Sequence, residues 1–248
     1  MLREVRAARE PVICITSENF ELLHDDGAAL EQLRDGLLAS GYQPAIVLYL
    51  RPQADYLESL YAELLKAWDV GFEEFFEGIL AHGSFGPSLF DYERLTASFA
   101  RTFGRDRLIV RPYVAGARPE TLQHEFVELL APGAIPPRRL VLPPRLNRMA
   151  TFREVVAMRA RQVQCETHYA MPAAQRFDPL SLLDLARVLV RFAESNERVE
   201  RSYGVRIGCA SAGTLAREVL AELLRDRASR FRKRLIRALV TTEIDIAA

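Results

Sequence analysis

Residues 45–66, AIVLYLRPQADYLESLYAELLK, carry a strand pattern followed at once by a helix pattern. The first six residues are all apolar, which is typical of a buried parallel strand. Pro52 then stands where the first turn of a helix tolerates proline, and leucine and tyrosine side chains recur at helical spacing as far as Trp68. The segment therefore predicts that Arg51 ends a strand and that Ser59 lies two turns into the following helix.

Two similar segments on either side extend this strand into a sheet. Residues 11–16, PVICIT, form a β-branched run, and residues 107–110 form another after a helical pattern over residues 92–103. Between the first two runs, leucine and alanine side chains mark one face of a helix over residues 27–40, which Gly41 ends. Strand, helix and strand of these lengths predict a right-handed βαβ unit. The sequence therefore predicts an α/β fold with a parallel sheet flanked by helices.

The rest of the chain is predicted to be mainly helical. A short helix is expected at residues 72–80 and a loop at residues 81–89, where glycine and proline recur. We interpret residues 1–248 as one domain in three parts: an α/β core at 11–130, a proline- and arginine-rich loop at 131–150, and a mostly helical C-terminal half at 151–248. Helices of that half are expected at residues 151–164, 180–200 and 214–239.

The composition places the chain among ordinary globular proteins. Its 248 residues include 33 basic and 33 acidic side chains and are 49% hydrophobic, which excludes disordered, collagen-like and coiled-coil classes. A formal net charge of zero argues against a nucleic-acid partner. The cysteines and histidines show no zinc spacing, so no metal is expected, and a cytoplasmic location fits the odd, scattered cysteines. No apolar run is long enough to predict a transmembrane segment.

Each predicted strand is followed by a polar residue that could contact a ligand: Glu18, Arg51 and Arg111. Open parallel sheets bind ligands at this end, where strands lead into helices. Arg51 and Ser59 lie eight positions apart, and a guanidinium and a hydroxyl so placed can converge on one phosphate. The alternative is a structural arginine that pairs with Asp55 or Glu58.

The other two strand-end residues also have structural interpretations. Glu18 could cap the helix that follows it, because acidic side chains suit a helix start. Arg111 could border a ligand cleft together with Tyr113, or it could form a salt bridge at the end of the sheet. The sequence leaves these alternatives open.

Residues 45–66 resemble the 3′-phosphate-binding strand and helix of sulfotransferases that use 3′-phosphoadenosine 5′-phosphosulfate (PAPS), in particular a bacterial family associated with surface polysaccharides. The resemblance spans most of residues 11–204 through the segments CITSENF, DYERLTASFARTFGRDRLIVRPY, HEFVELL, PRLNRMATFREVVAMR and FAESNERVERSYG. It implies a P-loop-like fold, PAPS as co-substrate and a carbohydrate hydroxyl as acceptor. It also implies that Arg51 and Ser59 bind the 3′-phosphate and that Glu18 is the general base.

The sequence departs from this family at one motif. The family fold begins with a strand, a glycine-rich loop bearing lysine and threonine, and a helix, which together bind the 5′-phosphosulfate. No GxxKxGTT-like segment occurs in the 248 residues, whose lysines are Lys66 and Lys233. Since sulfuryl transfer depends on positioning and charge stabilisation, activity without this loop is in question. Either about eighty upstream residues are missing, roughly one βα unit with its following helices, or the chain is a non-catalytic nucleotide- or glycan-binding scaffold protein of a polysaccharide system.

Overall fold

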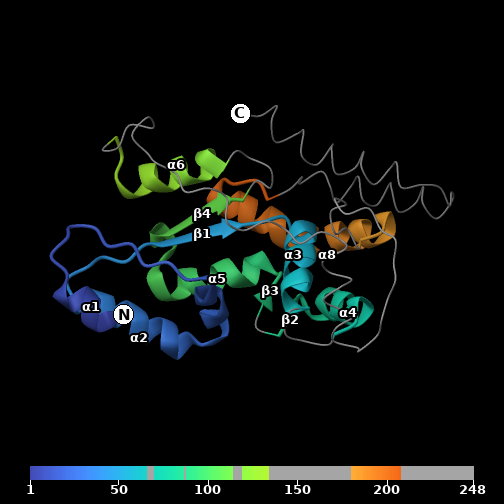
Figure 1. Ribbon diagram of the computed structural model, residues 1–248, viewed down its shortest axis with the longest axis horizontal. Coiled ribbons are helices and arrows are strands. Elements are labelled where there is room, and N and C mark those ends of the chain that lie inside the picture. The colour runs from blue at the N-terminus through green and yellow to red at the C-terminus, as the bar shows by residue number, and fades with distance from the viewer. Residues whose placement is uncertain (66–69, 87, 114–118, 134–179, 208–248) are drawn as a thin grey trace, which may run out of the picture.

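The computed structural model describes residues 1–65, 70–86, 88–113, 119–133 and 180–207. These ranges form an α/β arrangement in which helices outnumber strands (Figure 1). The helices are α1 (Leu2–Ala7), α2 (Gly27–Leu38), α3 (Gln53–Leu64), α4 (Phe72–His82), α5 (Tyr92–Phe103), α6 (Pro119–Leu130) and α8 (Leu182–Tyr203), with the 3₁₀ helices η1 (Glu18–Asp25) and η2 (Arg105–Arg107). The strands are β1 (Ile46–Leu50), β2 (Ser84–Phe85), β3 (Ser88–Leu89) and β4 (Leu108–Pro112).

The sheet that carries the candidate site consists, in the described ranges, of β1 and β4. The two strands are parallel, with Ile46 opposite Leu108 and Leu50 opposite Pro112. The backbone amide of Tyr113 donates to the carbonyl oxygen of Leu50 at 2.7 Å, so the ladder continues one residue beyond β4. Proline has no N–H to give a neighbouring strand, so Pro112 suits an outer edge. Figure 1 shows α5 and α6 on opposite sides of the two strands.

The predicted strand at residues 11–16 is wrong. These residues have no regular secondary structure, no strand in the described part of the chain pairs with them, and Val12 is 57% exposed. A strand needs hydrogen bonds from a neighbour, so a β-branched run does not make one by itself. Instead of a βαβ unit, the chain forms α1, a segment without regular secondary structure, η1 and α2 before it enters β1. The parallel sheet flanked by helices is therefore present in a small, two-stranded form.

The predicted helices are confirmed where the structure describes them. Asp91 caps α5 by accepting from the amide of Arg94, and Gly104, with a φ of 93°, ends that helix. Ser181 and Asp184 form a capping box at the start of α8, the helix predicted at residues 180–200. Residues 81–89 were predicted as a loop. In the structure, β2 and β3 pair there as a short antiparallel hairpin.

Two clusters of buried side chains form the core. The first packs α3 and α4 against the first half of α8, with Leu57 and Phe192 among its members. The second packs one face of the sheet against α2 and α5, with Phe99 and Leu108 among its members. Val199, in the second half of α8, belongs to this second cluster. α8 therefore connects both parts of the core.

Some predictions fall outside the described residues. They concern the helices at residues 151–164 and 214–239 and residues 134–150 of the proline- and arginine-rich loop. Where the structure does describe the chain, no helix has both the length and the apolar character that crossing a membrane requires.

Candidate anion-binding site

Arg51 stands directly after β1, at the carboxyl end of the sheet, as the sequence predicts. Side chains alternate along a strand, so Arg51 lies on the same side of the sheet as Tyr49 and opposite the buried Leu50. The Nε atom of Arg51 is buried and has no hydrogen-bond partner among the described residues. Its guanidinium carbon lies 5.6 Å from the centroid of the Tyr113 ring, whose face attracts a cation.

The structural alternative for Arg51, a pair with a nearby acid such as Asp55 or Glu58, stays a prediction. Glu58 is fully buried on α3. The guanidinium of Arg51 contacts the Tyr113 ring, and its Nε–H group has no acceptor among the described residues.

Aromatic residues fix the backbone and the surroundings of Arg51. The hydroxyl of Tyr92, at the start of α5, donates to the carbonyl oxygen of Arg51 at 2.5 Å. The hydroxyl of Tyr56, in the first turn of α3, donates to Oε1 of Glu21 at 2.7 Å. Burial raises the pKa of Tyr92 well above its ordinary value, and the negative charge of Glu21 acts in the same direction; burial also raises the pKa of Tyr56. Both phenols therefore stay protonated and can donate hydrogen bonds.

Sequence reasoning missed this surrounding cluster. Glu21 lies 35 positions from its partner Tyr56, and Tyr92 lies 41 positions from Arg51. No local pattern marks such pairs, because they form only when η1, α3 and α5 pack together. One indication was present in the sequence: Tyr92 follows Asp91 at the start of a predicted helix. A tyrosine that only packs in the core can have the same pattern.

Ser59 lies on α3, in the second turn after the cap Pro52, and its side chain is half-buried. The sequence predicted this placement correctly. The rise of a helix separates Ser59 from the first residue of α3 by about 9 Å along the axis. Ser59 and Arg51 thus belong to the same strand-to-helix connection, and their joint contact with a phosphate stays a prediction.

Glu18 does not follow a strand of the sheet, contrary to the prediction, because residues 11–16 form none. It is instead the first residue of η1. Ser17 caps that helix, since its hydroxyl accepts a hydrogen bond from the amide of Asn19 at 3.1 Å. The side chain of Glu18 lies outside the described part of the structure, so its role as general base stays a prediction.

Arg111 lies in β4 and its side chain is exposed. Its Nη1 donates to the carbonyl oxygen of Val110 at 3.3 Å. Backbone groups alternate in direction along a parallel strand, and Tyr113 donates to β1, so the carbonyl of Val110 points to the outer edge. This contact is with the preceding residue along the chain, and a place for Arg111 beside a ligand cleft stays a prediction. The salt bridge considered for Arg111 is not formed with any described residue.

The described residues hold no group of three or more histidine, cysteine, aspartate or glutamate side chains that could bind a metal ion. Comparisons with family models, with curated proteins and with solved structures give no match to this chain. A functional assignment must therefore come from the chemistry of the residues around Arg51.

Proposed function

We propose that this chain binds the 3′-phosphate of a PAPS-type nucleotide through Arg51 and Ser59. The observation that supports the proposal is the buried Nε of Arg51, which has no partner among the described residues. In this proposal the two-stranded sheet is part of a P-loop-like sulfotransferase fold. The reaction is transfer of a sulfuryl group from PAPS to a carbohydrate hydroxyl.

The chemistry of Arg51 suits a phosphate ester. A buried N–H without an acceptor is unfavourable, because it has lost its hydrogen bonds to water. A phosphate oxygen would supply the missing acceptor and would also neutralise the charge. Nε and a neighbouring Nη form the planar fork with which arginine binds phosphate through two hydrogen bonds. The Tyr113 ring on one side and the hydrogen bond from Tyr92 to the Arg51 carbonyl oxygen help to orient this fork.

The roles of Ser59 and Glu18 come from the resemblance to PAPS-dependent sulfotransferases. Ser59 donates a further hydrogen bond to the same phosphate. Glu18 takes the proton of the acceptor hydroxyl while the new bond from oxygen to sulfur forms and the bond between sulfur and the phosphate oxygen breaks.

A non-catalytic nucleotide- or glycan-binding scaffold protein is the second candidate. One observation favours it: the 248 residues contain no glycine-rich loop with lysine and threonine for the 5′-phosphosulfate. A scaffold protein would keep the Arg51 contact and would lack transfer activity. Incubating the chain with PAPS and a mixture of polysaccharides, and measuring sulfate incorporation, separates the two candidates.

The binding proposal predicts that Arg51→Ala weakens the binding of adenosine 3′,5′-bisphosphate. Loss of a charge-assisted hydrogen bond typically lowers affinity by about tenfold to a hundredfold. Isothermal titration calorimetry of the wild type and of the variant measures this change. Arg101→Ala, which removes an exposed arginine of α5, is the matched control and should keep the wild-type affinity.

Two results would contradict the proposal. The first is equal affinity of wild type and Arg51→Ala for the bisphosphate. The second is equal affinity of the wild type for adenosine 5′-monophosphate, which lacks the 3′-phosphate.

A further inference from the structure

Two neighbouring residues of α8, Ser195 and Asn196, bind the starts of the two helices near Arg51, α5 and α3. Asn196 forms a reciprocal pair of hydrogen bonds with Gln53: Gln53 Nε2 donates to Asn196 Oδ1 at 2.7 Å, and Asn196 Nδ2 donates to Gln53 Oε1 at 3.0 Å. Gln53 is the first residue of α3, two positions after Arg51, and is only 5% exposed. Its Nε2 also donates to the carbonyl oxygen of Phe90 at 3.2 Å.

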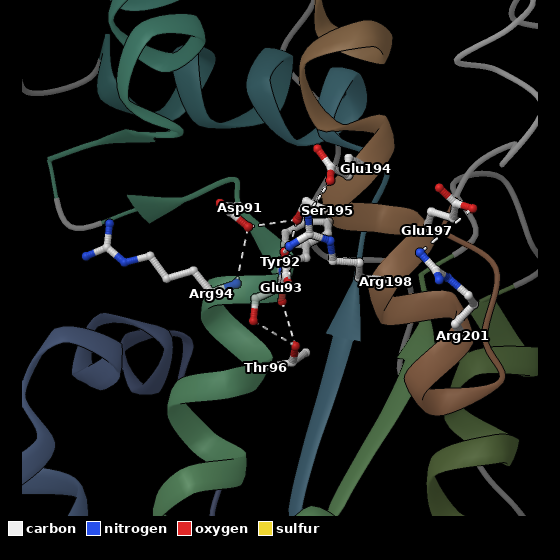
Figure 2. A network of polar contacts seen from close by, with 10 residues as sticks. All are labelled: Asp91, Tyr92, Glu93, Arg94, Thr96, Glu194, Ser195, Glu197, Arg198 and Arg201. Atoms are coloured by element: carbon white, nitrogen blue, oxygen red, sulfur yellow. Dashed lines mark hydrogen bonds and ion pairs between the residues drawn. The ribbon is translucent and has the colours of Figure 1, made fainter.

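Ser195 fixes the start of α5 in the same region. Its hydroxyl donates to Oδ1 of Asp91 at 2.7 Å and accepts from the backbone amide of Glu93 at 3.0 Å. Figure 2 shows Ser195 pointing from α8 toward the turn that contains Asp91, Tyr92 and Glu93. Tyr92 is the residue whose hydroxyl binds the carbonyl oxygen of Arg51.

Arg51 is therefore held from three directions. The β1–β4 ladder fixes the residue before it, through the bond from Tyr113 to Leu50. Tyr92 fixes its carbonyl oxygen, and the pair of Gln53 and Asn196 fixes the helix that begins after it. Of these three links, the last is made directly by a side chain of α8, Asn196, which is 143 positions away from Gln53 along the chain.

We infer that Asn196 is a positioning residue for the anion site at Arg51. This inference rests on the proposed function, since it assigns a partner to the phosphate-binding arginine. The amide pair sets the direction in which α3 leaves the sheet. That direction fixes where Ser59, on α3, lies relative to the guanidinium of Arg51. Asn196 itself touches no ligand.

The amide pair is suited to this role because it is closed and mostly shielded from solvent. Each amide satisfies the other through one donor and one acceptor, so a shift of either helix breaks both hydrogen bonds together. An apolar contact would tolerate sliding of α8 along α3. A reciprocal amide pair defines one register between the two helices.

The test compares three variants with a control. Asn196→Leu removes the amide, and Gln53→Asn shortens its partner. The double variant Gln53→Asn with Asn196→Gln moves one methylene group across the pair and keeps its total length. Arg187→Ala is the control: it breaks the contacts of Arg187 with Glu77 and with the Phe76 ring, near the other end of α8.

Two measurements report how firmly the side chain of Arg51 is held. The first is the nuclear magnetic resonance order parameter of the Arg51 Nε–H bond in the unliganded protein, assigned from its absence in Arg51→Ala. The second is the affinity for adenosine 3′,5′-bisphosphate by calorimetry. Thermal denaturation of every variant measures stability separately.

We expect Asn196→Leu to lower the Nε–H order parameter and to weaken the bisphosphate affinity by about tenfold, the effect of one buried hydrogen bond. Gln53→Asn should act in the same direction, and the double variant should recover most of the loss. Arg187→Ala should lower the melting temperature and leave both readouts at their wild-type values. If Asn196→Leu does not fold, the comparison of Gln53→Asn with the double variant decides alone.

The inference and the proposed function fail in different ways. Wild-type order and affinity in Asn196→Leu and in Gln53→Asn would overturn the inference and leave the binding proposal intact. An equal loss in Gln53→Asn and in the double variant would also overturn it. A wild-type protein that does not bind the bisphosphate would refute the proposed function, and the order parameter would still test whether Asn196 positions Arg51.

Discussion

Burial and a neighbouring carboxylate raise the pKa of the Tyr56 phenol, with burial as the larger cause. The hydroxyl donates to Glu21 at 2.7 Å, and a deprotonated phenol could not do so. The folded state therefore favours the protonated form more strongly than the unfolded state does. Because the folded pKa lies above the unfolded value of about 10, this contribution is complete below pH 10 and is lost as the pH rises through the folded pKa.

Tyr56→Phe tests this linkage. At pH 8 we expect a loss of about 1 kcal/mol in the free energy of unfolding, because one hydrogen bond disappears. Between pH 10 and 11 the stability of the wild type should fall more steeply than that of the variant, since the variant has no phenol at this position. Urea denaturation at a series of pH values measures both effects. Parallel profiles for the two proteins would show that the Tyr56 phenol is not linked to folding, and Tyr42→Phe serves as a control outside the cluster.

The sequence predicted some residues of the candidate site and missed others for a physical reason. Arg51 and Ser59 were found because they share one strand-to-helix connection, where spacing along the chain determines spacing in space. Glu21, Tyr92 and Asn196 were not found, because each reaches the site through tertiary packing. Their partners lie 35, 41 and 143 positions away along the chain.

At the scale of the element, the positions of helices follow from the local sequence, whereas the positions of strands depend on distant partners. A helix satisfies its own backbone, and its ends are marked by local caps such as Asp26, Asp91 and Ser181. Helix positions could therefore be predicted closely. A strand depends on a partner that the local sequence does not specify. The β-branched run at residues 11–16 has the composition of a strand, and in the described structure it has no partner.

Removing Asp26 and removing Asp91, which both cap helices, should lower the free energy of unfolding by different amounts. Asp26 accepts from the amide of Ala29 at the start of α2 and makes no bond to another helix among the described residues. Asp91 accepts both from the amide of Arg94 and from the hydroxyl of Ser195. We expect Asp26→Ala to lower the free energy of unfolding by about 1 kcal/mol and Asp91→Ala by about 2 kcal/mol.

Urea denaturation of both capping variants measures this difference. The double variant Asp91→Ala with Ser195→Ala should cost less than the sum of the two single variants, because they remove the same hydrogen bond. Equal losses in Asp26→Ala and Asp91→Ala, or simple additivity in the double variant, would mean that Asp91 acts as a helix cap alone.

At the scale of the whole molecule, α8 is the element that joins the two core clusters. Phe192 belongs to the cluster with α3 and α4 and is 1% exposed, and Val199 belongs to the cluster with the sheet and is also 1% exposed. The two residues lie about two helical turns apart on one rigid element. A loss of buried apolar contacts on the α4 side should therefore also lower the stability of the sheet.

Phe192→Ala should destabilise both core clusters together. Removal of a buried phenylalanine costs about 3–5 kcal/mol, and in a single cooperative unit every protected amide shares that loss. Hydrogen exchange measured by mass spectrometry should then accelerate by the same factor in α4 and in β1, although β1 makes no contact with Phe192 in its cluster. Val190→Ala, at an exposed position of α8, is the control and should leave exchange unchanged. Phe192→Leu replaces the alanine variant if that variant does not fold. Acceleration in α4 with wild-type exchange in β1 would mean that the two clusters unfold independently, and that α8 does not transmit stability to the strand end where Arg51 lies.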